Sequence, residues 1–122
     1  MADREKLVIM VTRGPSDPER ATIPFVMAGA ALASDVDVVM GFQAEAVRLV
    51  QRGQVDGVEA AGFPPLAKLV ADFRELGGVA LVCGPCLKAR AIVADDLVDG
   101  AEVVAAGRFV AEITSATNAL TY

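Results

Sequence analysis

The sequence predicts an α/β fold in which a parallel sheet carries helices on both faces. Short apolar runs rich in β-branched residues alternate along the chain with longer segments of helical spacing, and this alternation is typical of consecutive β-α-β units. The runs are apolar throughout, as expected for strands that are buried on both faces. With 122 residues, we expect a single domain over residues 1–122 that buries its core without disulfides or a structural metal.

The first strand is expected over residues 7–11, an unbroken apolar run of the kind found in parallel sheets. A helix is expected to follow over residues 19–34. Ser16 and Glu19 have the spacing of a capping box, in which each side chain accepts a hydrogen bond from a backbone amide at the helix start. Pro24 lies inside this segment, so the helix either kinks there or begins shortly before it.

The middle of the chain is predicted to contain a strand, two helices and a further strand. We expect the second strand over residues 36–40 and a short helix over residues 44–52. After a stiff turn at residues 62–65, apolar residues recur at helical spacing and predict an amphipathic helix. These apolar residues are Leu66, Leu69, Val70, Phe73 and Leu76. The third strand is predicted over residues 79–82.

The last third of the chain is predicted to alternate between helices and short strands. A short helix is expected over residues 87–94, a fourth strand over residues 102–104 and a helix over residues 107–117. Residues 120–122 are expected to form a terminal strand at one edge of the sheet.

Three loops are predicted to meet at the carboxyl edge of this sheet, where parallel sheets collect their ligands and reactive groups. They are residues 12–17, 41–43 and 83–86. Each follows a predicted strand, so we expect the three loops to face a shared cleft.

The Cys83-Gly84-Pro85-Cys86 motif is the clearest indication of chemistry. Cys83 follows a strand and Pro85 opens a helix, so free amide groups at the helix start are expected to stabilise a thiolate and to lower its pKa. Arg90 lies one turn beyond Cys86 and adds positive charge. We interpret Cys83 as a nucleophile and Cys86 as a second, resolving thiol. The alternative is that both are small buried apolar residues.

Arg13 is the residue of the first loop that is expected to face the thiols. The loop over residues 12–16 has the position of an anion site at a helix start, but an ordinary capped turn explains it as well. A flavin would use the same loop and would need aromatic side chains around its ring. The chain has one tyrosine and five phenylalanines, which lie mostly in apolar patterns. We therefore expect no cofactor.

The composition excludes several classes of site. The chain contains no histidine, so a Ser-His-Asp or Cys-His triad cannot form within it. Two cysteines cannot complete a tetrahedral zinc site. Asp95, Asp96 and Asp99 are interpreted as a solvated cap rather than a metal cluster, and we expect no metal.

The charge and hydropathy of the chain limit the classes of partner that it can have. The net charge is -5, and no basic cluster is present to neutralise nucleic-acid phosphates. The longest apolar run, residues 23–33, is shorter than the roughly 20 residues that cross a bilayer, and the charged N-terminus lacks a signal-peptide core. We expect a cytoplasmic protein with no nucleic-acid or membrane partner. Because 54% of the residues are hydrophobic, we also expect a homo-oligomer that buries excess apolar surface.

The whole chain resembles the DsrE/DsrF-like family of small sulfur-relay proteins. The segments that carry the resemblance are residues 6–12, 17–21, 24–25, 62–66, 82–90 and 120–122. The resemblance implies a three-layer α/β/α fold with a five-stranded, mainly parallel sheet, and homo-oligomers that are trimers or hexamers. It also implies that Cys83 carries sulfur as a persulfide and passes it from a donor protein to an acceptor protein. One branch of the family usually has glycine where this chain has Ala91.

Three functions remain open from the sequence. The first is a sulfur carrier or sulfurtransferase that acts through a persulfide on the cysteine motif. The second is a dithiol–disulfide oxidoreductase, because Cys-Gly-Pro-Cys is also the active-site tetrapeptide of thioredoxins. The third is a non-catalytic oligomeric binding module, in which replacing both cysteines by serine would leave partner binding and the cellular phenotype unchanged.

Overall fold

The computed structural model describes residues 4–122, so the first three residues of the charged N-terminal stretch lie outside the described part. The elements alternate between strands and helices as expected. In chain order they are β1 (Lys6–Val11), α1 (Pro18–Ala33), β2 (Asp37–Phe42), the 3-10 helix η1 (Ala44–Val50), α2 (Leu66–Glu75), β3 (Val79–Cys83), α3 (Gly84–Ala89), the 3-10 helix η2 (Ala94–Asp96), β4 (Glu102–Val104), α4 (Ala106–Ser115) and β5 (Asn118–Thr121).

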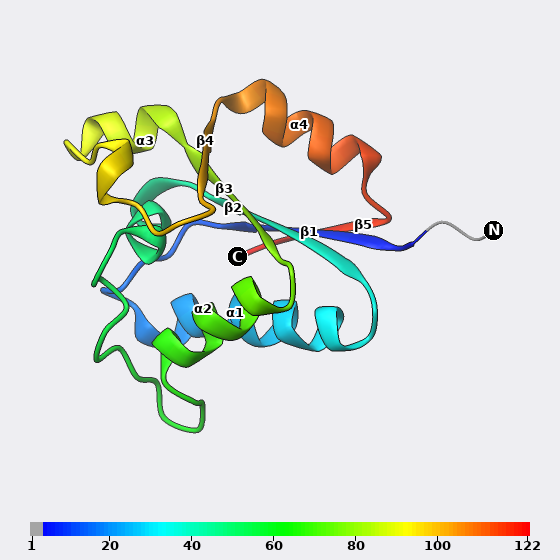
Figure 1. Cartoon of the computed structure of the whole chain (residues 1–122), viewed down its shortest axis with the longest axis horizontal. Helices are drawn as coiled ribbons and strands as arrows, with labels where there is room; N and C mark the ends of the chain where they lie inside the picture. Colours follow the sequence, from blue (N-terminus) through cyan, green and yellow to red (C-terminus); the bar gives the residue numbers. More distant parts are fainter. Residues whose placement is uncertain (1–3) are drawn as a thin grey trace.

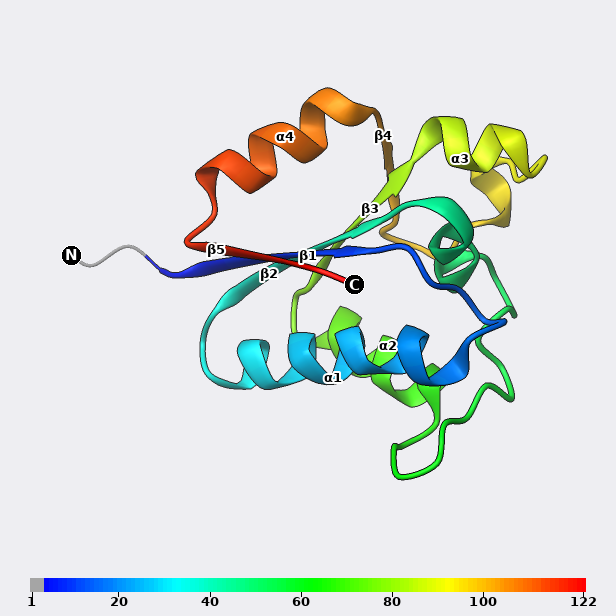
Figure 2. The same cartoon turned by 180° about the vertical axis from the view of Figure 1, so that it is seen from behind.

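The strands form one five-stranded sheet in the order β4-β3-β2-β1-β5, and every pair is parallel. Crossovers between parallel strands are right-handed in nearly all proteins. The crossovers from β1 to β4 all move in one direction, whereas the crossover from β4 to β5 returns across the sheet. Helix α4 therefore lies on the face opposite α1 and α2, and the three layers are visible in Figures 1 and 2. The α/β class is confirmed, and the sheet is wholly parallel.

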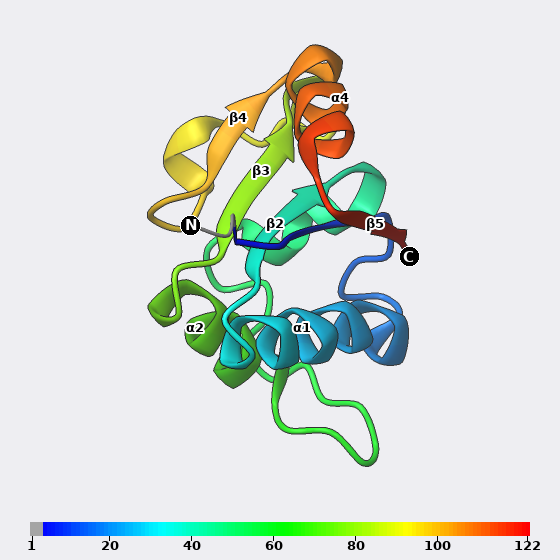
Figure 3. The same ribbon diagram turned by 90° about the vertical axis from the view of Figure 1, so that its right-hand side faces the viewer.

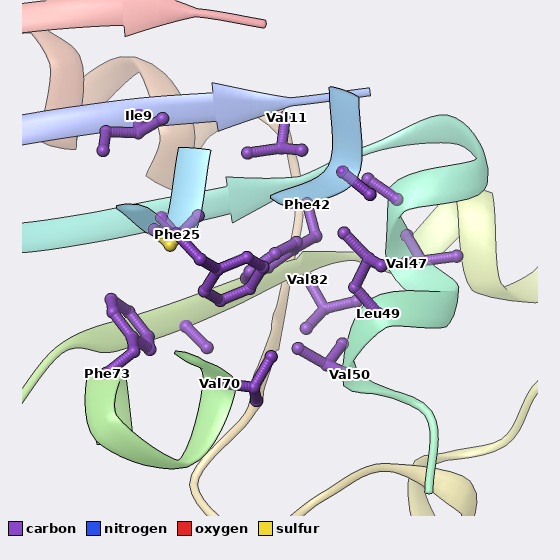
Figure 4. Close-up of a cluster of buried hydrophobic side chains, with 14 of the residues drawn as sticks. Ile9, Val11, Phe25, Phe42, Val47, Leu49, Val50, Val70, Phe73 and Val82 are labelled. Atoms are coloured by element: carbon purple, nitrogen blue, oxygen red, sulfur yellow. The ribbon is translucent and has the colours of Figure 1, made fainter. Parts of the chain in front are cut away.

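Two apolar clusters, one on each face of the sheet, form the core. Alternate residues of β1 supply them, because successive side chains of a strand point to opposite faces. The cluster beneath α1 and α2 includes Phe25, whose ring lies 5.9 Å from that of Phe42 and 5.8 Å from that of Phe73, as Figure 4 shows. The cluster beneath α4 is smaller. Its buried members are Val8, Met10, Val39, Leu81 and Phe109.

The start of α1 differs from the predicted capping box. Asp17 is the N-cap, and its carboxylate accepts a hydrogen bond from the Arg20 amide at 3.3 Å. The Ser16 hydroxyl instead donates to Glu45, a residue of η1. The helix runs unbroken from Pro18 to Ala33 with Pro24 inside it. Serine and aspartate are both favourable N-cap residues. Because the Ser16 hydroxyl is bonded to Glu45, Asp17 caps the helix in its place.

The carboxyl ends of β3 and β4 lie next to each other at a point where the chain diverges (Figure 3). The connection that follows β3 packs Leu87 into the cluster beneath α1 and α2. The connection that follows β4 packs Phe109 into the cluster on the opposite face. Adjacent strands whose connections leave on opposite faces form a topological switch point, which is where open α/β sheets bind ligands. Cys83 is the last residue of β3.

Candidate functional site

The two cysteines lie together at the junction of β3 and α3. Cys83 is the N-cap of α3, and its Sγ accepts a hydrogen bond from the Cys86 backbone amide at 3.4 Å. The helix begins at Gly84, three residues before its predicted start, because this sulfur caps it. Both cysteines are free and half-buried. The Cys86 thiol also lies close enough to the Cys83 thiol to raise the pKa of Cys83.

The second sulfur has an amide donor of its own. The backbone N–H of Ala44, the first residue of η1 after β2, donates to Cys86 Sγ at 3.3 Å. Ala44 has a φ of +53°, in the left-handed region that residues with a Cβ rarely adopt. Each sulfur therefore accepts one backbone hydrogen bond. The donor to Cys83 is in its own helix, and the donor to Cys86 is at the start of η1.

The electrostatic setting of Cys83 differs from the expectation of a lowered pKa. Burial raises the pKa of the Cys83 thiol above its usual value, and the hydrogen bond and charge of Cys86 raise it further. The Cys86 amide and the positive charge of Arg90 act in the lowering direction, but they are outweighed. The prediction of a stabilised thiolate was wrong in direction because it counted the helix start and omitted the cost of desolvating the charged form.

Arg90 lies beside the cysteines, as predicted. It is half-buried, and its guanidinium donates to the backbone carbonyl of Cys86 at 3.2 Å. Gly84 lies against β4, since a Cβ built on it would be 3.4 Å from a side-chain carbon of Val103. Pro85 is exposed in the first turn of α3.

Arg13 does not join this group. It is exposed and lines a separate depression with Arg20, Ile23 and Tyr122. Its charge acts on Asp17, whereas the cation that acts on Cys83 is Arg90. The expectation that Arg13 faces the thiols has no support in the described contacts, because the loop turns its side chain toward α1 and the end of the chain.

The shared edge of the three predicted loops is held together by η1. The Glu45 carboxylate accepts the Ser16 hydroxyl at 2.6 Å and the Ser16 amide at 3.3 Å. The preceding residue, Ala44, donates to Cys86. The loops after β1, β2 and β3 are therefore linked in series. Sequence reasoning missed Ala44 and Glu45, and their position after the second strand was the one available signal.

An apolar cavity of about 380 Å³ adjoins the cysteine motif on the β4 side. Lys88 is its one charged lining residue. The other lining residues are Gly84, Leu87, Ala91, Ile92, Val93, Ala94 and Val103. Ala91 has a φ of +53°, a conformation that glycine adopts without strain.

Within residues 4–122, acidic and thiol groups do not gather into a cluster of metal-ligating side chains. Asp96 accepts the Val93 amide at 3.0 Å, and Asp99 pairs with Arg52 at 3.0 Å. The same part of the chain contains no helix long and apolar enough to cross a membrane.

The model of the DsrE/DsrF-like family matches residues 5–122. The chain belongs to this family. It is 28% identical over 117 residues to MJ0989, an uncharacterized protein of Methanocaldococcus jannaschii, and the match covers 96% of this chain and 99% of that protein. It is 30% identical over 105 residues to MJ0760 of the same organism, where it covers 86% of this chain but only 38% of the longer relative.

Two solved structures share the fold of this chain. The ychN protein from E. coli superposes with a TM-score of 0.82 at 22% identity, and the match covers 97% of this chain and 99% of that one. MTH1491 from Methanobacterium thermoautotrophicum, a protein of unknown function, gives a TM-score of 0.78 at 17% identity with the same coverage.

Proposed function

We propose that this DsrE/DsrF-like protein is a sulfur carrier that holds sulfane sulfur as a persulfide on Cys83. The observation that supports the proposal best is the placement of Cys83. Cys83 is the last residue of β3 and lies at the switch point of the sheet. Its half-buried side chain accepts a backbone hydrogen bond at sulfur and lies beside a second thiol. Family membership supports the same role.

Loading and delivery would be two successive displacements at sulfur. The Cys83 thiolate attacks the terminal sulfur of a donor persulfide, so that a bond forms between Cys83 Sγ and that sulfur while the donor thiolate leaves. In delivery, an acceptor thiolate attacks the same terminal sulfur, and Cys83 leaves as a thiolate. The Cys86 amide that faces Cys83 Sγ would stabilise the leaving anion, because hydrogen bonds to a charged form favour it.

The raised pKa of Cys83 bears on the loading step. The thiolate is the reactive form, and burial keeps Cys83 protonated at neutral pH. Loading by a donor persulfide is therefore expected to accelerate as the pH rises above neutrality. Arg90, which lowers the pKa of Cys83, is assigned a supporting role, as are Gly84 and Pro85, which shape the turn that presents the sulfur.

The test is persulfide loading followed by mass spectrometry. The reduced protein is incubated with a cysteine desulfurase and cysteine, and its mass is measured intact and after proteolysis. We expect the added mass of one sulfur atom on Cys83 in the wild type and in Cys86→Ser, and none in Cys83→Ser. Loading that persists in Cys83→Ser, or that is absent from the wild type while a known carrier is loaded in parallel, would refute the proposal.

The contact between the two thiols also favours a second candidate, a dithiol–disulfide oxidoreductase. Here Cys83 and Cys86 would form a disulfide while a substrate disulfide is reduced to two thiols. Insulin reduction distinguishes the candidates, since an oxidoreductase needs both thiols. Rapid insulin reduction that is lost in Cys86→Ser would favour this candidate, whereas undiminished loading of Cys86→Ser favours the carrier.

We also propose that the protein works as a homo-oligomer, trimeric or hexameric, in the cytoplasm, with donor and acceptor proteins as its partners. Exposed apolar side chains on α4 and β4 support association, because contact between copies would remove their apolar surface from water. They are Val103, Val110 and Ile113. Light scattering of the purified protein tests the oligomer, and a monomeric mass at micromolar concentration would refute it.

A further inference from the structure

We propose that Glu45 is a positioning residue for Cys86, which it reaches through the backbone amide of Ala44. The inference rests on the proposed function because it concerns the thiol beside Cys83, the residue that we propose to carry the persulfide. It goes further because it assigns a role to a carboxylate that lies outside the cysteine motif, in η1.

The carboxylate of Glu45 is fixed at both oxygens. The Ser16 hydroxyl donates to Oε1 at 2.6 Å, and the Ser16 amide donates to Oε2 at 3.3 Å. The residue also packs on Gly14, where an added Cβ would lie 2.5 Å from the Glu45 carbonyl oxygen. The hydrogen bonds from Ser16 hold the pKa of Glu45 below its usual value, so the group is charged at neutral pH.

The residue before Glu45 carries the contact to sulfur. Ala44 has a φ of +53°, which is unfavourable for a residue with a Cβ and persists only where the surroundings impose it. The turn around it is held on both sides, because the Gln43 amide donates to Val11 at 3.0 Å and the Ala46 amide donates to Gln43 at 3.0 Å. In this conformation the Ala44 amide points at Cys86 Sγ, 3.3 Å away.

The hydrogen bond from the Ala44 amide to the Cys86 sulfur has a chemical consequence. A hydrogen bond from an amide favours the charged form of the group that accepts it, and the thiolate is the nucleophile. The Cys86 thiolate would attack Cys83 Sγ of the persulfide, so that an Sγ–Sγ bond forms while the bond to the terminal sulfur breaks. That sulfur leaves as hydrosulfide, and the two electrons that reduce it come from the cysteine pair as it becomes a disulfide. Glu45 would thus control how readily Cys86 discharges the carrier.

The test measures the reactivity of each thiol separately. The rate at which iodoacetamide alkylates Cys86 is measured as a function of pH in two proteins. One carries Cys83→Ser alone, and the other carries Cys83→Ser together with Glu45→Gln. We expect alkylation of Cys86 to be roughly threefold slower in the double variant at each pH, because the Ala44 amide that contacts Cys86 Sγ would no longer be held in place. In the Cys86→Ser background, the Cys83 profile is expected to be the same with and without Glu45→Gln.

Two further variants sharpen the result. Asp72→Asn makes the same carboxylate-to-amide change at an exposed ion pair with Lys68, and it should leave both profiles unchanged. Ser16→Ala removes the hydroxyl that anchors Glu45 and should move the Cys86 profile in the same direction as Glu45→Gln. If Glu45→Gln fails to give a cooperative melting curve, the Ser16→Ala variant tests the positioning role of Glu45 instead.

An unchanged Cys86 profile in a folded Glu45 variant would overturn the inference, and so would an equal change at both thiols. These measurements need only the reduced protein. A failure of persulfide loading would therefore refute the proposed function without touching the positioning role of Glu45, and the two failures are distinguishable.

Discussion

Replacing Phe109 with alanine is expected to loosen helix α4 and to destabilise the protein by about 3 kcal/mol, the low end for a buried phenylalanine. Phe109 is the one buried residue of α4 and is 5% exposed. Its ring packs over Gly41, where an added Cβ would lie 2.8 Å from it. The ion pairs of α4, from Arg108 to Glu102 and from Lys6 to Glu112, cannot replace it, since partly exposed pairs contribute about 1 kcal/mol or less.

Urea denaturation followed by circular dichroism measures this loss in the free energy of unfolding, and a thermal scan measures the melting temperature. For a chain of this size, about 3 kcal/mol corresponds to a melting temperature about 12 °C lower. The matched control is Thr114→Ala, because Thr114 is an exposed residue of the same helix and is not one of the apolar side chains that we propose to support association. We expect this control to stay within about 0.5 kcal/mol of the wild type. A loss below about 1 kcal/mol in Phe109→Ala would refute the view that one side chain fastens α4 to the sheet.

The same substitution also tests the cause of the Cys83 pKa. Cys83 packs against the cluster that contains Phe109, and burial is the largest factor that raises the pKa of its thiol. Loosening α4 should admit water, bring that pKa closer to its usual value and speed alkylation of Cys83 at neutral pH. An unchanged pH–rate profile in a folded Phe109→Ala variant would contradict this account.

Two further substitutions have clear expected outcomes. Ala91→Gly should stabilise the protein by about 0.5–1 kcal/mol, because Ala91 has a φ of +53° that costs a residue with a Cβ more than glycine; a lower urea midpoint would contradict this. Hydrogen bonds from Lys6 and Arg108 lower the folded-state pKa of Glu112 below its usual value. Its carboxylate therefore stabilises the fold above that usual value, and this contribution is lost as the pH falls through the folded-state pKa. Glu112→Gln should therefore lose less stability than the wild type on acidification below about pH 5, as parallel melts would show.

The strands were predictable because their signals are local. A strand buried on both faces in a parallel sheet must be apolar along its length, and β1, β2 and β3 lie within two residues of the predicted ranges. The helix ends were less predictable, because the partner that caps a helix can come from elsewhere in the chain. The Ser16 hydroxyl donates to Glu45 and so does not cap α1. The Cys83 sulfur caps α3, which begins three residues before the predicted range of residues 87–94.

The sequence by itself determined the α/β class, the family and the adjacency of Cys83 and Cys86 at a strand end, since each depends on the order and type of neighbouring residues. Only the tertiary structure decided which arginine reaches the thiols, which amide faces each sulfur, and the direction in which the Cys83 pKa moves. Those properties depend on distances between loops that are far apart in the chain and on how completely α3, α4 and the sheet exclude water from one sulfur atom.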